Sequence, residues 1–167
     1  MFSRILSKNV DDVNFYVYVV NIMKPETVFL IGNQLAVVGW LILLVSWFVP
    51  FVRSMVKFAV IPLLFAVAYT TIVVGSFGNS GGDFQSLSGV MKLFTSPWAV
   101  TAGWIHYLAF DMFVGMWEFQ DAKKHGIPFW AMLPCWFLTF MFGPIGLLLY
   151  VLVRLTKTRS LKLWGEV

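Results

Sequence analysis

A few polar side chains interrupt long apolar runs, and these are the residues whose types could do chemistry. The clearest is Asp111, which lies between Phe110 and Met112 in the middle of the apolar run 97–117. A carboxyl group in such surroundings must be paired, face a water-filled cavity or stay protonated, because burying an isolated charge is costly. Asp111 is therefore a candidate acid. Its alternative role is a structural hydrogen bond to a neighbouring helix, for example to Asn33.

At helical spacing, Asp111 shares one face of the predicted helix with other polar residues, which together form a polar stripe. At 100° per residue, Tyr107, Glu118 and His125 fall within about 40° of one another and of Asp111, and Asp121 lies about 80° from Asp111 on the same side. If the helix continues past residue 117, the stripe runs from mid-membrane to the surface and predicts a proton path or a wet cleft. The alternative, which is commoner for charged connections, is that Glu118, Asp121 and His125 belong to a solvated loop.

His106 lies about 140° from Asp111, on another face of the same predicted helix. It could still reach a cleft from that angle and act as a base. We expect Asp111, His106 and Glu118 to be the catalytic residues. The candidate ligand-binding residues are Asn33, Trp104, Tyr107 and Asp121.

The sequence gives little reason to expect a metal or a cofactor. It contains two histidines and one cysteine, whereas zinc sites usually take three or four ligands. Asp121 and His125 are four residues apart, a spacing that could chelate a metal but that is common by chance. No phosphate-binding loop, dinucleotide fingerprint or nucleophile elbow occurs. Cys135 lies in an apolar run and is predicted to be a buried, unreactive thiol.

The elements that must position these residues are membrane helices. Apolar residues make up 59% of the chain and charged residues 12%, against about 45–50% and about 25% in soluble domains. Four runs are long enough to cross a bilayer, which takes about 20 residues. These runs are 26–50, 58–77, 97–117 and 127–153. We therefore predict an all-α, polytopic membrane protein with four transmembrane helices.

The charged residues flank the apolar runs, which indicates contacts with membrane lipid rather than with nucleic acid. Residues 1–25 are predicted to be an N-terminal extension at the membrane surface, 26–154 the four-helix membrane domain, and 155–167 a basic tail. Four crossings place the N-terminus, the loop 78–96 and the tail on one side, which then holds most of the Lys and Arg residues. Because basic residues stay inside, both termini are predicted to be cytoplasmic.

Two details qualify this topology. Gly143-Pro144 is the place where the fourth run could break. Aromatic residues near the ends of the runs are expected at the membrane–water interface. They are Trp47, Trp98, Trp117, Trp130 and Tyr150.

Two segments resemble a known membrane family. They are SLSGVMKLFTSPWAVTAGWIHYLAFDMFVGMW at residues 86–117 and DAKKHGIPFWAMLPCWFLTFMFGPIGLLLYVLVR at residues 121–154. Both are similar to the abscisic-acid-deficient-four-like family, named for a plastid protein needed to make the allenic carotenoid neoxanthin. The matching positions are Gly103 to Gly115, Asp121, Ile127-Pro128, Pro134-Cys135 and Leu138 to Tyr150. With the similar stretch from Pro25 through Asn33 to Trp40, the resemblance covers residues 23–154.

The resemblance implies an isomerase that converts an epoxycarotenoid-like isoprenoid to an allene. The reaction is redox-neutral and needs an acid to protonate the epoxide oxygen and a base to remove a vinylic proton, but no cofactor. Asp111 would be the acid, and His106 or Glu118 the base. The apolar walls for a long polyene would be Trp104, Phe110 and Phe113.

Two positions depart from the family pattern and leave the substrate open. Met116 stands where arginine often follows FVG, and Phe129 stands where histidine often follows Ile-Pro. The N-terminus does not resemble a Ser/Arg-rich transit peptide. We therefore expect a protein of a bacterial inner membrane, and most bacteria make no neoxanthin.

Three functions fit the sequence. An isomerase needs two titratable groups that converge in one pocket, whereas a non-catalytic lipid- or pigment-binding accessory protein needs only an apolar groove. A small transporter should contain inverted repeats, and the sequence contains no internal repeat. The expected partners are membrane lipid and an apolar small molecule such as a carotenoid. The sequence does not predict an oligomeric state.

Overall fold

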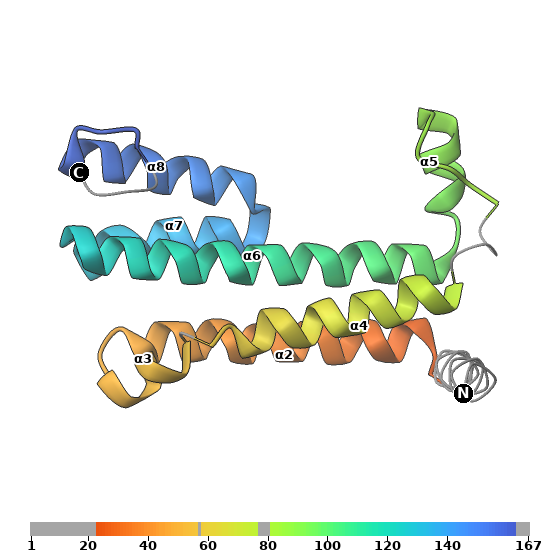
Figure 1. The fold of residues 1–167 in the computed structure, drawn as a ribbon, viewed down its shortest axis with the longest axis horizontal. Coiled ribbons are helices and arrows are strands. Elements are labelled where there is room, and N and C mark those ends of the chain that lie inside the picture. The colour runs from red at the N-terminus through yellow and green to blue at the C-terminus, as the bar shows by residue number, and fades with distance from the viewer. Residues whose placement is uncertain (1–22, 57, 77–80, 163–167) are drawn as a thin grey trace, which may run out of the picture. The chain divides into compact units, whose positions relative to one another are not determined.

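The computed structural model describes residues 23–56, 58–76 and 81–162. Residues 1–22 of the predicted N-terminal extension lie outside this described part. Every regular element within it is a helix, which confirms the all-α prediction. The helices are α2 (Pro25–Ser46), α3 (Pro50–Val56), α4 (Val60–Ser76), α5 (Leu87–Leu93), α6 (Pro97–His125), α7 (Phe129–Phe142) and α8 (Pro144–Thr158) (Figure 1).

The chain forms two compact units. Unit 1 comprises residues 1–34 and 64–106, and unit 2 comprises residues 35–63 and 107–167. Helices α2, α4 and α6 each contribute one part to each unit. The predicted polar stripe of α6 therefore belongs to unit 2, whereas His106 belongs to unit 1.

Helix α6 is longer than the apolar run that predicted it. It has 29 residues and ends at His125. Gly126 follows, and its φ of 63° is a left-handed conformation that favours glycine. The N–H of Ile127 then donates to the carbonyl of Ala122 at 2.9 Å and closes the helix end. Residues 118–125 are helical, so the alternative that they form a solvated loop is wrong.

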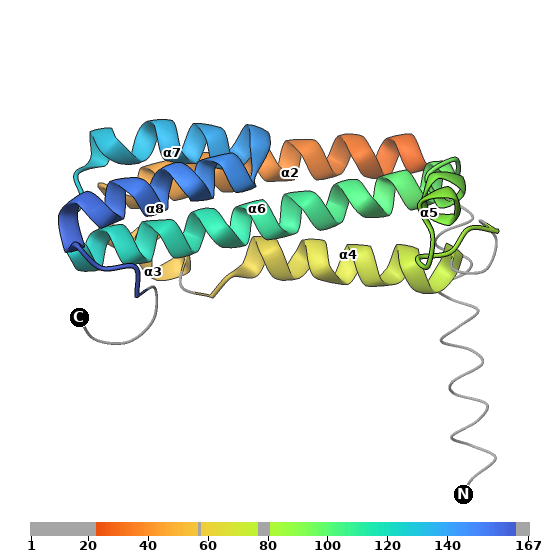
Figure 2. The same ribbon diagram turned by 90° about the horizontal axis from the view of Figure 1, so that it is seen from above.

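The run 127–153 does not form the single helix that the sequence predicted. Gly143, with φ 48°, ends α7, and Pro144 occupies the start of α8. The two helices lie side by side in both views (Figures 1 and 2). At 1.5 Å per residue they are about 21 and 22 Å long, shorter than a hydrocarbon core of about 30 Å. Residues 127–158 therefore form a helical hairpin, and the predicted basic tail begins inside α8.

The close approach of α7 and α8 depends on Gly146. A Cβ atom there would lie 2.0 Å from the backbone nitrogen of Thr139. Such a contact with backbone cannot be relieved by turning a side chain. Gly146 therefore fixes the spacing of the hairpin.

The apolar character of the helices supports a membrane location in part. Among the described residues, α2 is the helix long and apolar enough to cross a membrane, and α4 and α7 are apolar but shorter. Large apolar side chains remain exposed along α2 and α4, including Leu30, Leu41 and Val67. A soluble protein rarely exposes so much contiguous apolar surface.

Gly146→Ala should separate the hairpin helices and lower the free energy of unfolding in detergent by about 3 kcal/mol, because the added methyl group meets backbone. Gly126→Ala is the matched control. It places an alanine at positive φ with no atom within 4 Å of the new Cβ, so it should cost only about 1–2 kcal/mol of backbone strain. Equal losses in the two variants would contradict close packing at Gly146.

Candidate functional site

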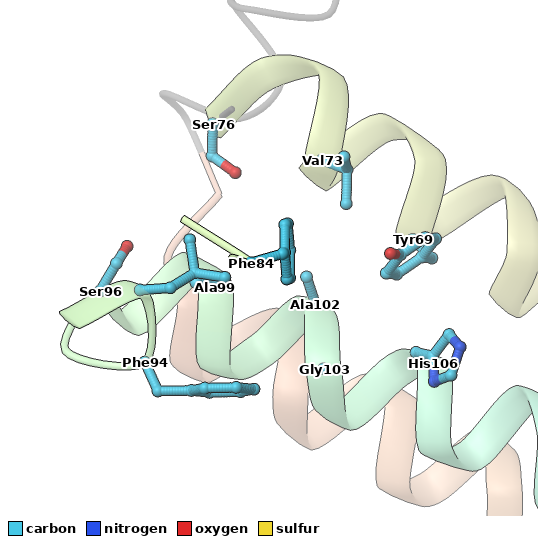
Figure 3. A pocket seen from close by; sticks show the side chains of 11 residues that line it. Tyr69, Val73, Ser76, Phe84, Phe94, Ser96, Ala99, Ala102, Gly103 and His106 are labelled. Carbon is cyan, nitrogen blue, oxygen red and sulfur yellow. The ribbon is translucent and has the colours of Figure 1, made fainter. Parts of the chain in front are cut away.

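A pocket with a volume of about 340 Å³ opens between α4, α5 and α6 of unit 1. Figure 3 shows Tyr69 of α4 and His106 of α6 at one end of it, and Ser76 and Ser96 at the other. The remaining walls are mostly apolar. The lining residues between these ends are Val73, Phe84, Leu93, Phe94, Ala99, Ala102 and Gly103.

Tyr69, which is half-buried, and His106, which is exposed, form one polar end of this pocket. Their ring centroids are 5.5 Å apart and the ring planes are tilted by 54°. A phenol hydroxyl can donate or accept a hydrogen bond, and an imidazole can take up or deliver a proton. The pair can therefore hold a polar group of a ligand and transfer protons to or from it.

The segment around α5 supplies the aromatic wall of the pocket, and its fold is fixed by local hydrogen bonds. The carboxylate of Asp83 accepts the backbone N–H groups of Gln85 at 2.8 Å and Ser86 at 3.2 Å. The Ser86 hydroxyl in turn caps α5 by accepting the N–H of Gly89 at 3.0 Å. These bonds hold the chain on either side of α5, so that Phe84 and Phe94 border the pocket.

Two of the predicted ligand-binding residues bind each other in unit 1. The indole N–H of Trp104 donates to Asn33 Oδ1 at 2.7 Å. The Trp104 ring also packs against Phe29, with centroids 5.3 Å apart. Neither Asn33 nor Trp104 lines the pocket. Asn33 therefore ties α2 to α6.

Phe110 and Phe113 do not border the pocket. They were expected to form the wall of a polyene site together with Trp104. Their side chains are 57% and 55% exposed, and neither lines the pocket beside His106. In a membrane helix, that exposure suits contact with lipid.

Asp111 is buried in unit 2, next to the turn of the hairpin. The Tyr107 hydroxyl, one turn earlier on α6, donates to the carbonyl of Phe140 at 3.2 Å, and among the described residues Asp111 Oδ2 has no hydrogen-bond partner. A Cβ atom at Gly143 would lie 2.7 Å from Asp111 Oδ1. Asp111 therefore contacts the point at which α7 ends.

Glu118 lies two helical turns beyond Asp111 on α6 and is fully buried. Its Oε1 accepts the hydroxyl of Thr139 at 3.0 Å, and among the described residues Oε2 has no hydrogen-bond partner. Thr139 is the residue against which Gly146 packs. The carboxyl group thus lies where α6 meets both hairpin helices.

Asp121 is the centre of a buried ion-pair network. Its Oδ2 accepts the Tyr150 hydroxyl at 2.5 Å and Arg154 Nε at 2.7 Å. Arg154 Nη1 also donates to the carbonyl of Ser160 at 3.1 Å, which fixes the chain just beyond α8. Tyr150, expected at the membrane interface, is completely buried.

His125 closes the network at the end of α6. Its Nδ1 lies 2.9 Å from the Asp121 carbonyl oxygen and 3.3 Å from Asp121 Oδ1. Its Nε2 lies 3.5 Å from Arg154 Nη2. This arrangement suits the neutral tautomer with the proton on Nδ1, because Nε2 then faces a donor.

The structure brings the predicted stripe together and separates it from His106. Tyr107, Asp111, Glu118, Asp121 and His125 all face the α7–α8 hairpin, as the cited contacts show. Asp111 and His106 lie about 140° apart on one continuous helix and face different elements. Among the described residues, no group of three or more His, Cys, Asp or Glu side chains could hold a metal ion.

Sequence reasoning missed three of the residues that matter here, Tyr69, Tyr150 and Arg154. It treated Thr139 as a weaker candidate, because a threonine can bond its own helix backbone. The spacing of Tyr150 and Arg154 was the available signal, since residues four apart lie on one face of a helix. The family-like motif ended at Tyr150, and Arg154 was counted only as part of the basic flank.

Asp121→Asn and Arg154→Met should each lower the free energy of unfolding by about 3–5 kcal/mol, because each leaves an uncompensated buried charge or donor. The double variant should lose less than the sum of the two single losses, because it contains neither charge. Thermal or chemical unfolding in detergent measures the three losses. Strictly additive values would show that the two side chains do not interact.

The comparisons with known proteins agree with the sequence motifs. The profile of the ABA DEFICIENT 4-like family matches residues 27–150, a range that includes the residues of the pocket and of the polar stripe. Neither a curated protein nor a solved structure matches the chain. Because the matched range exceeds half of the sequence, the chain belongs to the ABA DEFICIENT 4-like family.

Proposed function

We propose that this protein is an integral membrane protein that binds the polar end of a carotenoid-like isoprenoid in the pocket beside Tyr69 and His106. The observation that carries the proposal is the combination of a mostly apolar pocket and a polar end made by Tyr69 and His106. From Ala99 to His106 the pocket follows α6 for about 10 Å. Tyr69 and His106 lie at one end of the pocket, where they would bind the oxygen-bearing end group of the ligand.

The size of the pocket restricts what it can hold. Ligand pockets range over roughly 300–1,000 Å³, so a cavity of about 340 Å³ takes a ring-sized end group. The rest of a long polyene would extend into the surrounding lipid, where it needs no protein wall.

The reaction that the family resemblance implies can be carried by the same two residues. The Tyr69 hydroxyl would protonate the epoxide oxygen while its C–O bond breaks, and His106 would remove the vinylic proton. The electron pair of that C–H bond becomes the second double bond of the allene. The proton then passes from the imidazolium to the phenolate, so nothing is oxidised and no cofactor is consumed.

A second candidate function is binding without chemistry. It is favoured by the position of Asp111 and Glu118, the two carboxyl groups expected to join His106 in catalysis. Both contact the hairpin in unit 2, and neither lines the pocket. In this case the protein would hold a pigment or lipid for another enzyme.

We further propose that α2, α4 and α6 cross the membrane and that the α7–α8 hairpin enters it and returns. Three crossings put the two chain ends on opposite sides. One side then holds eight basic residues and the other four. The eight are Arg53, Lys57, Lys123, Lys124, Arg154, Lys157, Arg159 and Lys162, and the four are Arg4, Lys8, Lys24 and Lys92. Because basic residues stay inside, the C-terminus would be cytoplasmic and the N-terminus outside, in contrast to the topology that four crossings predict.

Val73→Trp should abolish binding of an epoxycarotenoid by purified protein, because Val73 lines the pocket and the larger indole ring would fill it. Val74→Trp is the matched control, since Val74 is the next residue on α4 and is 58% exposed. Binding is measured by co-purification and absorption spectra, and mass and absorption of the recovered molecule distinguish an isomerised product from an unchanged ligand. Equal loss or equal retention in the two variants would contradict the pocket.

Single cysteines should report the topology. Ser54→Cys and Leu161→Cys should both resist a membrane-impermeant thiol reagent applied from outside intact cells, whereas Ser88→Cys should react. All three side chains are exposed, and the native Cys135 is buried. Labelling of position 54 but not of position 161 would restore the four-crossing topology.

A further inference from the structure

A second apolar groove lies in unit 2, between α2 and α7, and has a volume of about 400 Å³. Its α2 wall contains the stripe Val37, Leu41 and Leu44, and its α7 wall the stripe Leu133, Phe137 and Phe140; Trp40 and Trp136 complete the two walls. It shares no lining residue with the pocket beside His106.

The two walls have the same helical spacing. On each helix the residues follow one another at intervals of four and three, which aligns them along one face. Each stripe is therefore about 10 Å long and straight. A straight groove with two matching apolar walls suits a single extended hydrocarbon chain better than a compact ligand.

A pair of cations lies at the surface end of this groove. Lys123 Nζ lies 3.7 Å from the centre of the Trp47 ring and donates to the Trp47 carbonyl at 3.1 Å. Arg53 Nη2 donates to the same carbonyl at 3.0 Å. The Trp47 ring packs edge-on against Trp136, 5.7 Å away, and Trp136 lines the groove.

No carboxylate of the described residues pairs with either charge. Within that part of the chain, Asp121 is the carboxylate that contacts basic side chains, and its partners are His125 and Arg154. Both side chains donate to the same Trp47 carbonyl oxygen, so two positive charges lie close together and repel each other. An anion beside the two side chains would relieve that repulsion.

We propose that the groove and this cation pair bind one anionic phospholipid, with an acyl chain between α2 and α7 and the phosphate against Lys123 and Arg53. The site rests on the membrane location in the proposed function, but not on the isoprenoid pocket. An isoprenoid hydrocarbon would use the groove but not the cations. The anionic headgroup therefore distinguishes this ligand.

The test uses the full-length protein in detergent, titrated with phosphatidylglycerol or with phosphatidylcholine of the same acyl chains. Phosphatidylglycerol should raise Tm at concentrations about tenfold lower, because each basic residue near an anionic headgroup contributes several-fold to affinity. Glycerol phosphate without chains should not raise Tm, which separates a lipid from a free phosphate.

Two pairs of variants complete the test. Arg53→Gln with Lys123→Gln should remove the preference for phosphatidylglycerol, whereas Arg53→Lys with Lys123→Arg keeps both charges and should retain it. Leu41→Trp should fill the groove and remove the response to both lipids, while Leu148→Trp, at an exposed position of α8, should leave it unchanged.

Equal responses of the unaltered protein to the two lipids, or a preference that survives the glutamine pair, would overturn the site. Flotation with phosphatidylcholine vesicles separates this failure from that of the proposed function. A protein that does not float contradicts the membrane location itself. A protein that floats but shows no headgroup preference contradicts only the phospholipid site.

Discussion

The carboxyl groups on one face of α6 are the constraint on which unit 2 depends. Asp111, Glu118 and Asp121 lie among apolar side chains, where an unpaired charge or an unsatisfied oxygen costs several kcal/mol. The hairpin contacts all three carboxyl groups: Asp111 lies against Gly143 after α7, Glu118 Oε1 accepts the Thr139 hydroxyl, and Asp121 binds two side chains of α8. Among the described residues, Asp111 Oδ2 and Glu118 Oε2 have no hydrogen-bond partner. A single straight helix over residues 127–153 could not supply partners from both of its halves.

Helix α6 consequently serves two purposes on two faces. The face that carries the carboxyl groups holds the hairpin, and the face that carries His106 borders the pocket. This division explains why a histidine and an aspartate only five residues apart need not work together. It also explains why the family-like motif around them is continuous, since the same stretch of helix both builds the hairpin interface and lines the pocket.

The sequence predicted the helical class, most helix positions and the polar stripe, because these depend on local periodicity and composition. It located a possible break at Gly143-Pro144 but still predicted one helix there, since an apolar run looks the same whether it is one helix or two. Nor did it predict the partners of the stripe. Arg154 reads as an ordinary basic flank until the hairpin brings it back to Asp121, and Tyr69 reads as an ordinary apolar-helix residue until α4 faces α6 in unit 1.

The division of α6 into a structural and a ligand-binding face is tested most directly by comparing Asp111→Asn with His106→Gln. Stability in detergent and bound epoxycarotenoid per folded molecule are measured for each. Asp111→Asn should change stability by no more than about 1 kcal/mol, because Asn keeps the size of the side chain that lies against Gly143, and it should keep the ligand. His106→Gln should keep stability and lose ligand binding or turnover. Loss of function without loss of stability in Asp111→Asn would contradict the account and make Asp111 the acid of the reaction.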